Sequence, residues 1–174
     1  MFINGLGTAV PARRYTQVEC WKALQRSGEF RRLKGRSRAI LRKVLTGSNG
    51  IVSRHLALER LEEAFDFSPD TLSARFLRNA PRLATEAGHR ALADAGTGPS
   101  AIDGLIISTC TGYLCPGLTS YVSERLGLRP DVLALDLVGQ GSGAAVPNLR
   151  GNGANHAASN DGMAANITMM KYDR

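Results

Sequence analysis

Two apolar runs on either side of one helical stretch constrain the fold of this chain more than any other feature. Residues 102–109 (IDGLIIST) and 132–138 (VLALDLV) are almost continuously apolar, which is typical of strands buried on both faces of a sheet. Residues 116–126 between them have the length of a helix, so the segment predicts a β-α-β unit. Because the crossover in such a unit is right-handed and makes its strands parallel, residues 110–117 and 139–143 are expected at one edge of the sheet. Any functional site is expected there.

Helical patterns dominate the chain before this unit. Thr16 and Glu19 have the spacing of a capping box at the start of a helix. The expected elements are a strand over residues 2–10 that ends at Pro11, helices over about 16–27 and 38–45, further helix from Pro69, and a helix over 82–95 with alanine on its apolar face and Gly96 at its end. The alternation of strand and helix predicts the α/β class.

The 174 residues have the composition of one ordinary globular domain, with 43% hydrophobic and 21% charged residues. We expect residues 1–150 to form this domain. Residues 151–174 are rich in turn-forming residues and lack a periodic apolar face before residue 167, so they are expected to form an irregular tail.

The N-terminal sequence MFINGLGTAVPARR lacks the basic start and long apolar run of a signal peptide, and no apolar run reaches the roughly 18 residues of a membrane span. The three cysteines, Cys20, Cys110 and Cys115, form an odd set without C-x-x-C spacing. This favours a reduced compartment over a disulfide framework or a zinc site. We expect a cytoplasmic protein without a metal site or a membrane partner.

The net charge of +7 is concentrated in one stretch, where seven basic residues lie between Arg31 and Lys43. Such a stretch favours an anionic partner. No aromatic residue is interleaved in it, which disfavours nucleic acid because base stacking has no platform there. A phosphorylated cofactor fits as well, and a solvated basic helix face remains an open alternative.

The segment GQGSGAA, which follows the second predicted strand, can be interpreted as one of three kinds of functional site. Gly139, Gly141 and Ala144 match the GxGxxA pattern of dinucleotide binding, with Asp161 about 20 residues further on. That acid should end a second parallel strand, whereas Asp161 lies in the polar tail, so this alternative is weak. A serine-hydrolase turn needs glycine two residues before the serine, where this chain has Gln140. The third chemistry comes from a resemblance.

The segments GLGTAVP, APRLATEAG, IDGLIISTCTGYLCPG, SERLGLRP and GQGSGAA, in this order, resemble the N-terminal half of the chalcone and stilbene synthase family, the type III polyketide synthases, especially bacterial members. The resemblance runs from about residue 2 to residue 150. It implies a thiolase-like fold of layered α/β/α architecture, of which this sequence has the N-terminal half only. It also implies a homodimer, acyl-CoA and malonyl-CoA as substrates without a bound cofactor, and decarboxylative condensation of malonyl-CoA onto an acyl starter held on a cysteine.

Ser142 stands where this family has its nucleophilic cysteine, according to the resemblance. A free thiol has a pKa of about 8.5 and needs little help to ionise, whereas an alcohol needs a positioned general base. The family's catalytic histidine and asparagine come from the C-terminal half, which this sequence does not reach. We therefore expect a chain that does not complete the reaction, and a non-catalytic partner of a full-length paralogue is the alternative.

The three histidines are not expected to replace the missing base. His55 and His89 are interpreted as structural or surface residues. His156, with Asn160 nearby, lies only about 14 residues past Ser142 in the polar tail, where no scaffold would position it.

Further site residues follow from the resemblance. Cys110 and Thr111 match positions that line the family's acyl cavity, and Cys115 matches a residue that reaches across the dimer interface. Small loop residues packed between helices are the alternative for these three. Arg42 and Lys43 lie in the region where the family binds the phosphates of coenzyme A, and Ser48 stands where another lysine is expected.

Overall fold

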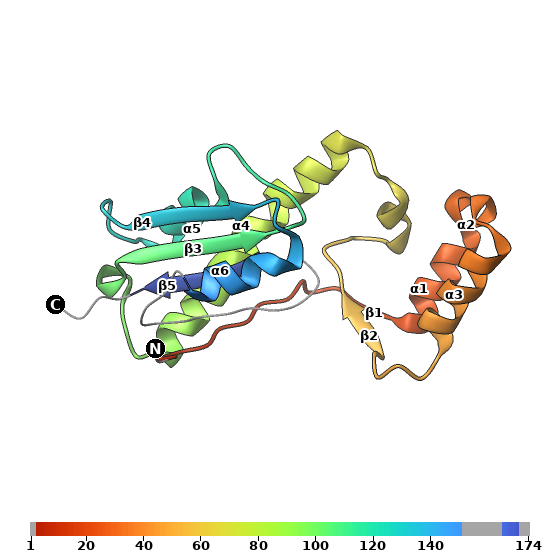
Figure 1. The fold of residues 1–174 in the computed structure, drawn as a ribbon, viewed down its shortest axis with the longest axis horizontal. Coiled ribbons are helices and arrows are strands. Elements are labelled where there is room, and N and C mark those ends of the chain that lie inside the picture. Colours follow the sequence, from red (N-terminus) through yellow and green to blue (C-terminus); the bar gives the residue numbers. More distant parts are fainter. Residues whose placement is uncertain (1–2, 151–164, 171–174) are drawn as a thin grey trace. The chain divides into compact units, whose positions relative to one another are not determined.

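The computed structural model describes residues 3–150 and 165–170 (Figure 1). Contacts divide the chain into two compact units, of which unit 1 is Met1–Val10 with Ser73–Arg174 and unit 2 is Pro11–Leu72. The segment 1–150, expected as one domain, therefore contributes to two units. No helix in the part of the chain that the structure describes is long and apolar enough to cross a membrane.

Unit 2 is a small helical unit closed by a short two-stranded sheet. Its elements are β1 (Arg14–Thr16), α1 (Gln17–Arg26), α2 (Gly28–Arg32), α3 (Gly35–Thr46), β2 (Ser53–His55) and the 3-10 helix η1 (Leu61–Phe65). The predicted capping box is confirmed, because Thr16 Oγ1 accepts from the Glu19 amide and the Glu19 carboxylate accepts from the Thr16 amide. β1 and β2 pair antiparallel. The helix expected over 38–45 is α3, which begins three residues earlier.

Unit 1 is built on a three-stranded sheet of order β4-β3-β5, with β3 (Gly104–Thr109), β4 (Leu133–Val138) and β5 (Ala165–Met170). β3 and β4 pair in parallel and α5 (Leu118–Leu126) connects them, so the predicted β-α-β unit is confirmed. Every residue of β3 is buried. The 3-10 helix η2 (Pro99–Ala101) precedes β3.

The expectation of an irregular tail is wrong for residues 165–170. This segment is β5, which pairs antiparallel with β3 and places Ile167 opposite Ile107 and Met169 opposite Leu105. Met169 is buried in the core of unit 1. The physical reason is that β3 has a second edge whose amides and carbonyls need partners, and a short apolar segment satisfies them. Residues 151–164 and 171–174 lie outside the described part of the chain.

The strand expected over residues 2–10 is also absent from the described residues 3–10, which instead run without a sheet partner along α4 (Pro69–Asp94). Side chains of α4 satisfy the backbone of this segment: the Leu6 amide donates to the Asp94 carboxylate (2.8 Å), and Arg90 donates to the Thr8 carbonyl. A Cβ atom on Gly7 would lie 2.1 Å from the Ala87 carbonyl oxygen. Glycine therefore permits a backbone contact that no other residue allows.

The core of unit 1 lies between the sheet and its helices. α4 and α5 lie on one face of the sheet and α6 (Ala145–Arg150) lies on the other (Figure 1). The alanine-rich side of α4, predicted from residues 82–95, is buried with Leu105 and Ile107 of β3 and Val122 of α5. The layered α/β/α arrangement expected from the sequence is therefore present.

β4 differs from the expectation of a strand buried on both faces. Leu133 and Leu135 are 54% and 44% exposed. β4 has a strand neighbour on one edge only among the described residues, and α5 packs on the face that carries Asp136. An apolar run alone does not reveal whether its strand lies at the centre or at the edge of the sheet, so this expectation is wrong in burial although correct in element type.

Candidate functional site

The carboxyl ends of β3 and β4 meet at one edge of the sheet, as the parallel pairing requires. Thr109, the last residue of β3, is in register with Val138, the last residue of β4. The segments 110–117 and 139–143 therefore begin side by side. In parallel α/β sheets this edge is where ligands bind, and here it carries Ser142, Cys110, Thr111 and Cys115.

A tight turn leads from β4 into the segment that carries Ser142. Gly139 and Gly141 have φ angles of +78° and +57°, in the left-handed region that favours glycine. The 3-10 helix η3 (Gly141–Ala144) follows at once and leads into α6, so Ser142 lies at the start of this helical segment. The dinucleotide alternative remains a prediction, because Asp161 lies outside the described residues.

A buried polar pair anchors α6 to the centre of the sheet. Asn148 of α6 is 1% exposed, and its Nδ2 donates to Ser108 Oγ of β3 at 3.0 Å. A buried amide without a hydrogen-bond partner is costly in free energy. This bond therefore fixes the position of α6, and of the turn before it, on the face of β3. Sequence reasoning missed Asn148. The available signal was Ser108, a hydroxyl in a strand predicted to be fully buried, which must find a partner somewhere.

The loop after β3 is held by two inward contacts. Gly112 faces the Phe76 ring of α4, where an added Cβ would lie 2.9 Å from Cγ, and Leu114 packs against the core. Cys110, Thr111 and Cys115 are exposed. Their assignment to the lining of an acyl cavity remains a prediction.

Thiol alkylation tests the exposure of these cysteines. Burial raises the pKa of the Cys20 thiol in α1 above its ordinary value, so less of its thiolate is present at a given pH. At pH 8 we expect iodoacetamide to modify Cys110 and Cys115 rapidly and Cys20 slowly, as followed by peptide mass spectrometry. The urea-unfolded chain, in which all three react alike, is the control. Rapid labelling of Cys20 with protection of Cys110 and Cys115 would contradict the exposure of this loop and would instead support the expected acyl cavity.

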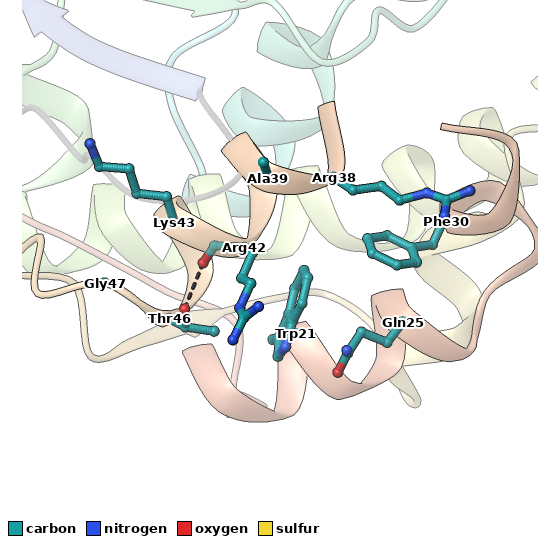
Figure 2. A pocket seen from close by; sticks show the side chains of 9 residues that line it. All are labelled: Trp21, Gln25, Phe30, Arg38, Ala39, Arg42, Lys43, Thr46 and Gly47. Carbon is teal, nitrogen blue, oxygen red and sulfur yellow. Dashed lines mark hydrogen bonds between the residues drawn. The ribbon is translucent and has the colours of Figure 1, made fainter. Parts of the chain in front are cut away.

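Arg42 and Lys43 lie on α3 in unit 2, where they line a pocket of about 630 Å³ (Figure 2). Neither side chain has an ion pair with a carboxylate within the described ranges. The segment from Phe30 to Leu58 contains no Asp or Glu. The two predicted phosphate-binding residues therefore share a pocket within unit 2, whereas Ser142 belongs to unit 1. Ser48 lies in the loop that follows α3.

The histidines have the roles expected from the sequence where the structure describes them. His55 Nδ1 lies 2.8 Å from the Pro11 carbonyl oxygen within unit 2, and His89 is exposed on α4. His156 and Asn160 lie outside the described residues.

Comparison with known proteins identifies relatives of this chain. It is 34% identical over 141 residues to a 1,3,6,8-tetrahydroxynaphthalene synthase from Streptomyces peucetius subsp. caesius, a match that covers 80% of this chain and 36% of that protein. It is 28% identical over 175 residues to the alpha-pyrone synthesis polyketide synthase-like Pks18 of Mycobacterium tuberculosis, covering 97% of this chain and 43% of that protein. No protein-family model matches. The chain thus spans less than half the length of these two relatives.

The fold is similar to that of a solved structure, PKS-I from the brown alga Ectocarpus siliculosus. The TM-score is 0.73 at 23% sequence identity, over 86% of this chain and 42% of that one. This likeness shows the thiolase-like fold over most of the chain, as the sequence predicted. The chain is therefore a homologue of the type III polyketide synthases, thiolase-like condensing enzymes, and covers about the N-terminal portion of these proteins.

Proposed function

We propose that this chain is the N-terminal part of an acyltransferase that condenses an acyl-CoA starter with malonyl-CoA, with Ser142 at the position of the nucleophile. The observation that carries this proposal is the Gly139–Gly141 turn at the end of β4, which presents residue 142 at the sheet edge beside the loop 110–117. With a cysteine at this position, residue 142 would take the acyl group from the starter as coenzyme A leaves. Malonyl-CoA would lose CO₂, and its carbanion would attack the bound acyl carbonyl and displace residue 142.

Serine at this position changes what the chain can do. A thiol becomes a nucleophile as the thiolate, and a helix start that favours negative charge by at most about 2 kcal/mol helps it to ionise. The same contribution is far too small to ionise an alcohol, which must instead pass its proton to a general base during attack. We therefore propose that the chain with Ser142 is not acylated.

The remaining assignments are supported by charge for Arg42 and Lys43 and by the resemblance for residues 110, 111 and 115. Arg42 and Lys43 would bind the phosphates of coenzyme A, because guanidinium and ammonium groups without a carboxylate partner suit that role. Cys110 and Thr111 would line the acyl cavity, and Cys115 would reach the cavity of a partner in a homodimer. A cytoplasmic location and the absence of a bound cofactor belong to the same proposal.

A non-catalytic role as partner of a full-length paralogue is the second candidate. The observation that favours it is the apolar surface of β4, since exposed leucines clustered on one strand are typical of surfaces that another chain covers.

Incubation with an acyl-CoA, followed by intact-protein and peptide mass spectrometry, tests the proposal. The native chain is expected to carry no acyl group on Ser142. Ser142→Cys is expected to acquire a thioester on the peptide that contains residue 142, because a thiolate then stands at the helix start.

Ser120→Cys is the matched control, since Ser120 is an exposed serine that belongs to α5 and not to the turn. Acylation at residue 142 in the first variant, well above acylation at residue 120 in the control, supports the proposal. An acyl adduct on Ser142 itself would refute the proposal that the native chain is not acylated. It would indicate a general base outside the described residues. The alternative role as a non-catalytic partner would be favoured by two results together. The new thiols of the two variants would be acylated equally, and the chain would sediment as an oligomer.

A further inference from the structure

We propose that Asp136 of β4 is a positioning residue for the site at the sheet edge. Its carboxylate caps α5 and so holds the loop 110–117 beside the turn that carries residue 142. This role deepens the proposed function and rests on it for the part that the loop plays in acylation. The capping contact itself is tested by a measurement that needs no acylation.

Asp136 is a carboxylate in an otherwise apolar strand. It is the one charged residue of the sequence from 132 to 149, and it is half-buried in β4. Its register partner on β3 is Ile107, which is fully buried. A carboxylate in such surroundings costs free energy unless hydrogen-bond donors surround it. The donors that offset this cost identify what Asp136 does.

These donors belong to the first turn of α5. The Thr119 amide donates to the Asp136 carboxylate, at 3.2 Å from Oδ1 and 3.4 Å from Oδ2, and the Thr119 hydroxyl donates to Oδ2. α5 begins at Leu118, and the residue at its N-cap position is Gly117, which has no side chain to cap it. Asp136 therefore supplies from β4 the cap that a serine or aspartate ordinarily supplies from the N-cap itself. Its negative charge is favourable at this end of a helix.

Gly117 leaves the space that the carboxylate occupies. A Cβ atom on Gly117 would lie 2.1 Å from Asp136 Oδ2 and 2.9 Å from Cγ. The φ angle of Gly117 is −60°, which any residue can adopt. Glycine is therefore needed here for the close approach of the carboxylate and not for its backbone conformation. The missing cap and the missing Cβ both point to Asp136.

The loop 110–117 is held at its start, its middle and its end. Its start and middle contact Thr109 of β3 and Phe76 of α4. Its end leads into the first turn of α5, which Asp136 holds from a position three residues before the turn at Gly139. This last contact ties the loop to the strand that ends in the turn. The position of the loop relative to residue 142 therefore depends on Asp136.

A cap that only stabilises α5 is the alternative role. The later turns of α5 are held without Asp136, because Val122 and Leu126 are buried in the core of unit 1. Loss of the cap is therefore expected to free the first turn of α5 and the loop before it while the rest of the helix stays packed. A purely structural cap would leave acylation at residue 142 unchanged.

Hydrogen exchange at the Thr119 amide tests the contact in the full chain. Asp136→Ala is expected to speed this exchange about tenfold or more, because the amide loses a charged acceptor. Asp136→Asn keeps an acceptor oxygen and is expected to restore most of the protection. Asp131→Ala is the matched control, since it removes the same carboxylate from an exposed side chain before β4 and is expected to change the rate by about twofold at most. Circular dichroism verifies that each variant is folded.

Gly117→Ala tests the same contact from the other side. In the native background the new methyl group displaces the Asp136 carboxylate, so exchange at Thr119 is expected to rise about tenfold or more. In the Asp136→Ala background the carboxylate atoms nearest to the methyl group are absent. Adding Gly117→Ala there is expected to change the rate by about threefold at most. Equal effects in the two backgrounds would overturn the cap.

Acylation tests the positioning role. In the Ser142→Cys chain, the sulfur of residue 142 attacks the acyl carbonyl of an acyl-CoA and coenzyme A leaves. Adding Asp136→Ala is expected to slow this transfer about fivefold or more, because the loop no longer holds the acyl group in line with the thiol. Alkylation of the same thiol by iodoacetamide needs no bound acyl group and is expected to change by about twofold at most. Peptide mass spectrometry follows both reactions at residue 142.

Each result decides between the alternatives. Slower acylation with unchanged alkylation supports the proposal. Faster exchange at Thr119 with unchanged acylation would overturn it and leave Asp136 as a cap of α5 alone. An equal loss of acylation and alkylation would also overturn it, because the turn itself would then have changed.

A proteolytic measurement separates this proposal from the proposed function. If Ser142→Cys is not acylated in any background, the proposed function fails. Cleavage by chymotrypsin after Tyr113, which is 74% exposed in the loop, then decides the role of Asp136. Cleavage about fivefold or more faster in Asp136→Ala than in Asp131→Ala supports the holding of the loop, and equal cleavage overturns it.

Discussion

Ile107→Ala is expected to lower the free energy of unfolding of unit 1 by about 2–5 kcal/mol. Ile107 is fully buried at the centre of β3, where it is in register with Asp136 of β4 and Ile167 of β5. Its side chain belongs to the core formed with α4 and α5. The substitution loses the transfer free energy of the buried methyl and methylene groups. It also leaves a cavity, which two neighbouring strands and two helices prevent from collapsing.

Urea unfolding followed by far-UV circular dichroism measures this loss. Ile40→Ala is the matched control, because it removes the same atoms from a side chain that is 54% exposed on α3. The control is expected to change the free energy of unfolding by no more than about 0.5 kcal/mol. Equal effects of the two substitutions would mean that β3 is not the centre of the core.

Gly7→Ala is expected to release the N-terminal segment from α4 and to cost about 1–3 kcal/mol or more. The new Cβ would lie 2.1 Å from the Ala87 carbonyl oxygen and 2.4 Å from the Ala91 amide nitrogen. Both are backbone atoms of the helix α4 and cannot rotate out of the way as a side chain could. The segment must move, and the hydrogen bond from the Leu6 amide to Asp94 is lost with it.

Hydrogen exchange at the Leu6 amide reports this release directly, alongside urea unfolding. Gly35→Ala serves as the control, since nothing lies within 4 Å of its added Cβ at the start of α3. Alanine is expected there to leave the Leu6 exchange rate unchanged and to preserve or slightly raise stability. A protected Leu6 amide in Gly7→Ala would show that the segment does not pack on α4 as described.

Sequence reasoning succeeded where the determining contacts are close in the chain. The capping box of α1 involves residues three apart, so their spacing alone predicts it. The β-α-β unit could also be predicted, because a helical crossover between two strands of one sheet returns the chain to the same end of the sheet and so makes the strands parallel.

The errors arise where the partner lies far away. Residues 2–10 have a composition that suits a strand, but Asp94, 88 residues after Leu6, satisfies the backbone instead. Strand β5 could not be predicted from its own six residues, because its pairing depends on the second edge of β3. The Asn148–Ser108 bond was missed for the same reason, because it joins residues of different elements.

The pairing of β3 with β5 has a consequence for how the chain acquires its structure during translation. β4 and α5 follow β3 closely and can pack on it as soon as they leave the ribosome, whereas β5 follows every other described element. Until residues 165–170 emerge, the second edge of the most buried strand has no such partner. Pairing distant segments is slow, because the chain loses loop entropy before the contact forms. For an interval during translation, the nascent chain therefore exposes an unpaired edge of the apolar strand β3. Chaperones or other nascent chains can bind this edge.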